Sequence, residues 1–111
     1  FGVSGGGAAG FELDRADVSL GTPANAVIVA RSEKHQSHFV TVPEELLNHL
    51  AAINGEPPAS LVRAEIIYAD LPKGGALFAT GSITFCGSLG HNGGVNNVSR
   101  LLENVVRRLM V

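Results

Sequence analysis

The glycine-rich stretch GSITFCGSLGHNGG, residues 81–94, holds two side chains that could carry out chemistry together. Cys86, the single cysteine of the chain, lies five residues before His91. A thiolate beside an imidazole is a strong nucleophile, and backbone N–H groups of such a loop can stabilise an oxyanion. Free cysteines are, however, among the most often buried residues, and Cys86 follows an apolar, strand-like run. The pattern favours a packed thiol, whereas His91 either reaches into a cleft or is a plain loop histidine.

Carboxylates near the start of the chain are a second candidate. Glu12 and Asp14 are two residues apart, so on an extended segment they share one face. One of them could act as a base while Arg15 neutralises the other, although an exposed charged loop explains the same pattern.

A metal site and a nucleotide site are less well supported. Glu33, His35 and His38 lie close together but lack the ligand set of a closed site, which favours a solvated turn. The glycine-rich loop over residues 1–10 contains G-x-G-x-x-G, yet neither the strand nor the helix of a dinucleotide fingerprint flanks it. The loop over 81–94 lacks the Gly-Lys-Ser/Thr ending of a phosphate-binding loop.

Composition limits the class of protein. The chain has 111 residues, of which 45% are hydrophobic, and a formal charge of −2. These values predict a single domain, or a fragment of one, with a modest core. We expect no nucleic-acid partner, because no basic stripe is present, and no membrane partner, because no apolar run is long enough to span a bilayer. A lone cysteine and no secretory signal favour the cytoplasm.

The elements that would position these side chains can be predicted from local patterns. The run NAVIVARS, residues 25–32, predicts a buried strand, and residues 39–42 predict a short edge strand. Pro43 opens a predicted helix that ends near Ile53. The runs over 63–69 and 76–83 predict an antiparallel hairpin joined by residues 70–75.

The last predicted element is a helix that starts near residue 97 and is capped by Asn96 or Asn97. Glu103 and Arg107 form an i,i+4 pair on its polar side. Its apolar stripe consists of Val98, Leu101, Leu102, Val105, Val106 and Leu109. The predicted fold class is therefore α/β or α+β, with a small mixed sheet of three to four strands and two helices.

Longer stretches of the sequence carry a family resemblance. They are GAAGFELDR (residues 7–15), LGTP (residues 20–23) and GGALFATGSITFCGSLGHNGGVNNVSRLLENVVRRL (residues 74–109). In this order they resemble the C-terminal segment of the N,N-dimethylformamidase large (β) subunit family. The resemblance implies an amidohydrolase that cleaves the C–N bond of a small amide, in a catalytic domain similar to the C-terminal end of a glutamine-amidotransferase-like domain.

The resemblance also implies a cofactor and site residues. In that family an iron held by two tyrosines and a glutamate activates water. Tyr68 is the single tyrosine of this chain, so the metal ligands are expected upstream, outside it. Glu12, in the FELD stretch, corresponds to a family acid near the metal and is the candidate general acid/base. The loop departs from the family at Gly90 and at residues 94–95, where a serine and a tyrosine-aspartate pair are expected, so its substrate contacts are open.

Three hypotheses follow. The main one is the C-terminal part of a metal-dependent amide hydrolase, with Glu12 as acid/base and with His91 and Asn92 facing the rim of the site as supporting or substrate-orienting groups. Its expected partners are the rest of the large subunit, a small subunit and a further copy of itself, with a small amide as substrate. The alternative is a noncatalytic packing or oligomerisation module. A self-contained Cys/His hydrolase comes third.

Overall fold

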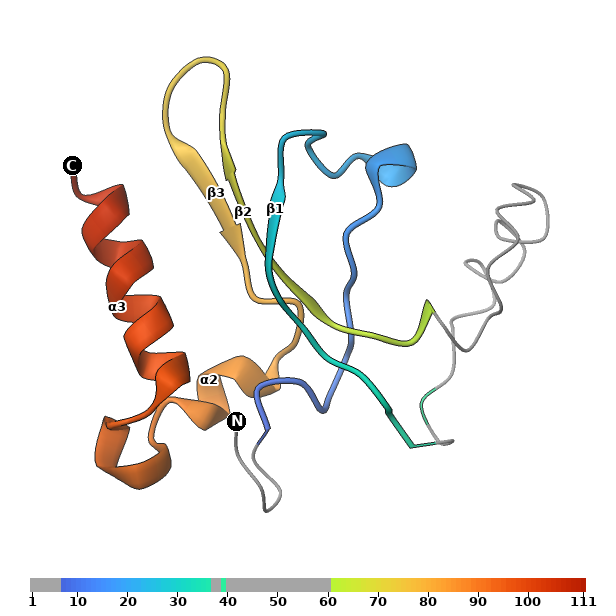
Figure 1. The fold of residues 1–111 in the computed structure, drawn as a ribbon, viewed down its shortest axis with the longest axis vertical. Coiled ribbons are helices and arrows are strands. Elements are labelled where there is room, and N and C mark those ends of the chain that lie inside the picture. Colours follow the sequence, from blue (N-terminus) through green and yellow to red (C-terminus); the bar gives the residue numbers. More distant parts are fainter. Residues whose placement is uncertain (1–6, 37–38, 40–60) are drawn as a thin grey trace.

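The computed structural model describes residues 7–36, 39 and 61–111 (Figure 1). The predicted helix over 43–53, most of the predicted edge strand over 39–42, and His38 lie outside these residues.

A three-stranded sheet forms the centre of the described part of the chain. Its strands are β1 (Val27–Arg31), β2 (Glu65–Asp70) and β3 (Ala76–Ala79), in the order β1-β2-β3. Both pairings are antiparallel. The predicted hairpin is confirmed, because β2 and β3 pair from Asp70↔Ala76 to Ile67↔Ala79 across the predicted linker. With the helices below, these strands confirm an α+β fold of the predicted class.

The first strand lies at an edge of the sheet, and the prediction that it is buried is wrong. Val27, Ile28 and Val29 are 60%, 42% and 43% exposed, respectively. A bulge between Ile28 and Ala30 shifts the register with β2. A run of β-branched residues indicates a preference for extended backbone. Whether the strand is buried depends on the elements that pack against it.

The third strand is shorter than predicted, and the chain after it is helical. β3 ends at Ala79, and Gly81 turns the chain with a φ of +70°. A Cβ on Gly81 would lie 2.5 Å from the carbonyl oxygen of Glu65, so the approach of these two backbones requires glycine. Residues 80–83, which were predicted to continue this strand, form a turn instead, and the helix α2 (Thr84–Ser88) follows them.

The position of Cys86 in α2 overturns its predicted burial. The inner side of this short helix is formed by Phe85 and Ser88, which are three residues apart and 1% and 2% exposed. Cys86 lies between them in sequence and is exposed. The packed-thiol prediction is therefore wrong, because it assumed a strand in which the apolar run would continue inward.

The final helix, α3 (Asn97–Leu109), confirms the sequence prediction. Asn96 is its cap and accepts a 2.9 Å hydrogen bond from the Ser99 N–H. Arg107 and Glu103 form the expected pair at 2.9 Å. None of the helices in the described ranges is long and apolar enough to cross a membrane.

The core lies between the sheet and the two helices. Figure 1 shows α3 running beside β3, with α2 at the lower end of the sheet. The rings of Phe78 and Phe85 meet edge to face, with centroids 6.2 Å apart. Ala8, from the glycine-rich loop at the start of the chain, packs within the core. The buried cluster consists of Ala8, Ile66, Phe85 and Val98, with Leu101 and Leu102 packed against it.

We predict that the apolar stripe of α3 stabilises the fold at its buried positions only. Val98 is 2% exposed, whereas Val106 on the same helix is 45% exposed. Val98→Ala should lower the free energy of unfolding by about 1.5–3 kcal/mol, from lost burial and the cavity left behind. Val106→Ala, the matched control, should change it by less than about 0.5 kcal/mol. Equal effects in urea denaturation would contradict this packing.

Candidate active site

A buried carboxylate organises the region around the candidate site. Glu65 begins β2, and its side chain is 0% exposed. Its Oε1 accepts hydrogen bonds from Nε of Arg31 at 2.7 Å and from Nε of Arg63 at 2.8 Å. Its Oε2 accepts from the Ala16 N–H at 2.8 Å. Both oxygens of this buried carboxylate thus accept charge-assisted hydrogen bonds, from donors in three different segments.

These bonds also fix the protonation state of Glu65. Burial alone would raise the pKa of this carboxyl group, because it disfavours the charged form. The hydrogen bonds from Arg63, Ala16 and Arg31, with the charge of Arg63, outweigh burial and hold the pKa below its ordinary value. Glu65 is therefore ionised and has a structural role.

The segment that carries Glu12 is attached to the backbone beside Glu65. The Asp14 N–H donates to the Gly81 carbonyl at 2.8 Å, and the Asp14 carbonyl accepts from the Glu65 N–H at 2.9 Å. On the other side of Glu12, the Phe11 carbonyl accepts from the Ile83 N–H at 3.2 Å. Residues 11–14 are thus bound at both ends to the chain that leads into α2.

Glu12 itself lies between these two attachments and is exposed. Its φ of +50° places it in the left-handed region, which few residues other than glycine adopt. Such conformations persist when the surrounding structure imposes them, and they are enriched at functional sites. The backbone hydrogen bonds on both sides of Glu12 therefore hold its main chain in this conformation.

The predicted loop residues His91 and Asn92 lie in a short 3₁₀ turn, His91–Gly94, between α2 and α3. Both are exposed. The Asn92 side chain donates to the Val95 carbonyl at 3.0 Å, and the His91 carbonyl accepts from the Asn96 side chain at 2.8 Å. The amide of Asn92 thus holds the turn. The imidazole of His91 lines a hollow of about 370 Å³ together with Ser88, Asn92, Val95, Asn96, Asn97 and Val98.

The predicted groups are not joined directly. Among the described residues, no hydrogen bond connects Glu12 with His91 or Asn92, or connects Cys86 with His91. The Cys/His hydrolase hypothesis therefore gains no support from the geometry. The roles of Glu12, His91 and Asn92 stay predictions.

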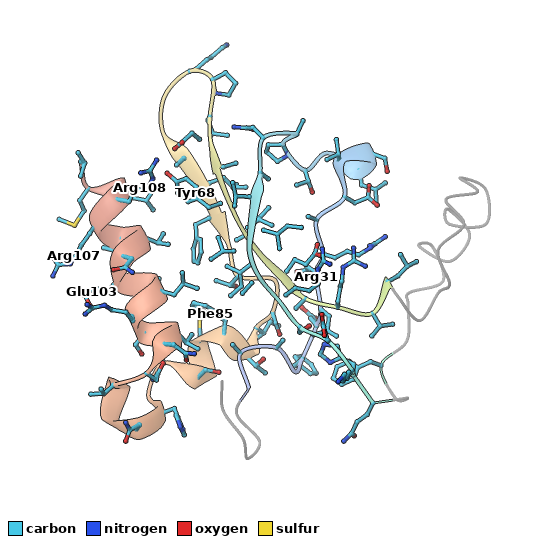
Figure 2. All side chains as sticks on the ribbon, in the orientation of Figure 1. Arg31, Tyr68, Phe85, Glu103, Arg107 and Arg108 are labelled. Atoms are coloured by element: carbon cyan, nitrogen blue, oxygen red, sulfur yellow. The ribbon has the colours of Figure 1, made fainter. Side chains whose placement is uncertain are left out.

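The iron site that the resemblance implies requires tyrosine and carboxylate ligands. The described ranges hold no group of three or more histidine, cysteine, aspartate or glutamate side chains that could bind a metal ion. The hydroxyl group of Tyr68 donates to Asp70 at 2.7 Å and accepts from Arg108 at 2.7 Å. Figure 2 shows the side chains of Tyr68 and Arg108 close together between α3 and the sheet. His35 contacts the Ser32 hydroxyl at 2.6 Å. The residues described do not fit a site with two tyrosine ligands.

Two residues central to this region were missed by the sequence analysis, Glu65 and Ser82. The signal for Glu65 was present, since a single acidic residue opens the apolar strand EIIYA and follows Arg63 by two positions. The hydroxyl of Ser82 donates to the Phe11 carbonyl at 2.8 Å, a contact over 71 positions that no local pattern indicates.

Comparison with known proteins decides the family. The family model for the C-terminal region of N,N-dimethylformamidase beta subunit-like proteins matches residues 1–98. The chain belongs to this family. The N,N-dimethylformamidase beta subunit of Paracoccus aminophilus is 44% identical over 110 residues, which cover 98% of this chain and 14% of that protein. The corresponding subunit of an Alcaligenes species is 42% identical over the same shares.

The family resemblance drawn from residues 7–15, 20–23 and 74–109 is therefore confirmed. The chain spans only 14% of the length of these relatives, so most of each relative has no counterpart here.

We predict that Glu65 makes stability dependent on pH. Since its pKa is lowered on folding, its contribution is complete above the unfolded value of about 4.3 and is lost as the pH falls through the folded pKa. Glu65→Gln should lower the free energy of unfolding at pH 7 by about 3 kcal/mol, because it leaves two arginines without their buried partner.

Urea denaturation between pH 7 and pH 3.5 measures this effect. The difference between the wild type and Glu65→Gln should shrink toward the acid end. Glu103→Gln, which removes an exposed carboxylate paired with Arg107, should change stability little at any pH. A difference that stays constant down to pH 3.5 would show that the charge of Glu65 is unimportant.

Proposed function

We propose that this chain supplies Glu12 as the general acid/base of an amide hydrolase that cleaves the C–N bond of a small amide. The observation that carries the proposal is the 42–44% identity, over 110 residues, to two proteins named as N,N-dimethylformamidase beta subunits. A dialkylformamide is accordingly the substrate to test first. The fixed and exposed position of Glu12 between two backbone attachments supports its role.

The chemistry requires one proton to move twice. The Glu12 carboxylate takes a proton from the water that attacks the amide carbonyl carbon. It then gives this proton to the leaving nitrogen as the C–N bond breaks, which yields a carboxylic acid and an amine. The iron that the resemblance implies, with its tyrosine ligands, would be held by residues other than those described. The described residues would take no direct part in binding it.

The loop between α2 and α3 has a supporting part in this proposal. The His91 imidazole, exposed at the hollow beside the turn, orients the substrate, while the Asn92 amide keeps the turn in shape through Val95. The remaining part of the beta subunit, a small subunit and a second copy of the chain are the proposed partners, and the cytoplasm is the proposed location.

A noncatalytic packing module is the second candidate, and one observation favours it. The edge strand β1 exposes three consecutive apolar side chains, Val27, Ile28 and Val29. Apolar surface of this kind at a sheet edge is typical of a region covered by another part of an assembly. Both functions can belong to one chain, and the activity of Glu12 variants separates them.

We predict that Glu12→Gln, in the full-length protein, lowers kcat by about 10²- to 10⁴-fold, because an amide cannot accept the proton. Metal content and folding should not change. His91→Ala should act mainly on KM. Cys86→Ala should alter neither rate nor stability, since this thiol is exposed and forms no hydrogen bond among the described residues.

Steady-state hydrolysis of N,N-dimethylformamide, with iron content and circular dichroism measured on the same samples, checks these expectations. Near-normal kcat in Glu12→Gln, together with loss of activity in Cys86→Ala, would overturn the proposal in favour of a cysteine nucleophile.

A further inference from the structure

We propose that Ser82 is the positioning residue that aims the Glu12 carboxylate, an inference that rests on the proposed function of Glu12. Ser82 lies between β3 and α2 and is 6% exposed. Its Oγ donates to the Phe11 carbonyl at 2.8 Å and accepts from the Gly10 N–H at 3.3 Å. One buried hydroxyl thus binds the Phe11 carbonyl, which immediately precedes Glu12, and the Gly10 N–H, two residues before it.

The residues on either side of Ser82 also form hydrogen bonds with the segment that carries Glu12. The next residue, Ile83, donates its N–H to the same Phe11 carbonyl, and the preceding residue, Gly81, accepts from the Asp14 N–H. Three consecutive residues therefore hold the backbone on both sides of Glu12. A second hydroxyl, on Thr84, lies 3.2 Å from the Ser82 Oγ and completes its hydrogen bonding.

The backbone conformation of Glu12 explains why these hydrogen bonds are needed. A left-handed backbone costs an L-residue about 1–2 kcal/mol, so a free loop would relax out of it. Because φ sets the direction of the Cα–Cβ bond, relaxation would turn the carboxylate away from its present place. Phe11 and Asp14 are the fixed points that prevent this, and Ser82 holds the first of them.

Gly81 makes the turn that places these hydrogen-bonding groups. Only a glycine fits against the Glu65 backbone at this point, and the resulting turn directs the Gly81 carbonyl toward Asp14 and the Ser82 hydroxyl toward Phe11. The burial of Ser82 then excludes water, which would otherwise compete for the Phe11 carbonyl.

A double-mutant cycle in the full-length protein tests this inference. Ser82→Ala should lower kcat for N,N-dimethylformamide by about 10- to 100-fold, since small misplacement of a catalytic group costs up to about 10²-fold, and should leave KM nearly unchanged. In the Glu12→Gln background the same change should cost less than about 2-fold, because Ser82 acts through the missing carboxylate. Ser82→Thr, which keeps the hydroxyl, should restore most of kcat.

Ser32→Ala is the matched control. The Ser32 hydroxyl also joins segments distant in sequence, since it accepts from the Ala64 N–H at 2.7 Å, and it has no part in the proposed site. This variant should lower the melting temperature about as much as Ser82→Ala but leave kcat within about 2-fold of the wild type. If Ser82→Ala does not fold, Ser82→Cys, whose thiol is a weaker donor, should show an intermediate loss of kcat that is absent in the Glu12→Gln background.

The possible failures are distinct. Unchanged kcat in Glu12→Gln overturns the proposed function. A large loss in Glu12→Gln, with Ser82→Ala costing the same factor in both backgrounds or nothing in either, overturns the positioning role alone.

Discussion

The buried carboxylate of Glu65 is the constraint on which the rest of the structure depends. A charge without exposure to water must be met by partners, and Glu65 finds them in Arg31 on β1, in Arg63 before β2 and in the Ala16 N–H. Arg31 is also the register partner of Glu65, so slippage of β1 by one residue would remove one of the two arginines paired with this carboxylate. The ion pairs therefore specify one arrangement of β1, β2 and the segment before β1.

The candidate site follows from the same arrangement. The backbone of Glu65 binds Asp14 and leaves room beside it only for Gly81, which turns the chain into α2. That turn brings Ser82 beneath the segment that carries Glu12. The buried carboxylate of Glu65 is thus connected to the segment that carries Glu12 through backbone hydrogen bonds. Stability and the proposed chemistry share one set of contacts.

Local patterns predicted some elements well and others poorly, for physical reasons. The stripe of α3, the cap at Asn96 and the hairpin over 63–79 depend on residues near in sequence, and they are confirmed. The burial of β1 and of Cys86 depends on what packs over them, and both predictions were wrong. Glu12 was found through family resemblance. The left-handed backbone of Glu12 and the hydrogen bond of the preceding Phe11 with Ser82 could not be predicted, because local patterns do not indicate contacts across about seventy positions.

In the proposed function, this chain brings Glu12 to the reacting amide. An experimental structure of the full-length protein with a slowly cleaved small amide bound tests this most directly. A Glu12 carboxylate oxygen should lie within about 2.6–3.2 Å of the amide nitrogen or of the water beside its carbonyl carbon, with the Ser82 hydroxyl still bound to Phe11. A Glu12 side chain that faces bulk solvent, with another acid at the amide, would contradict it.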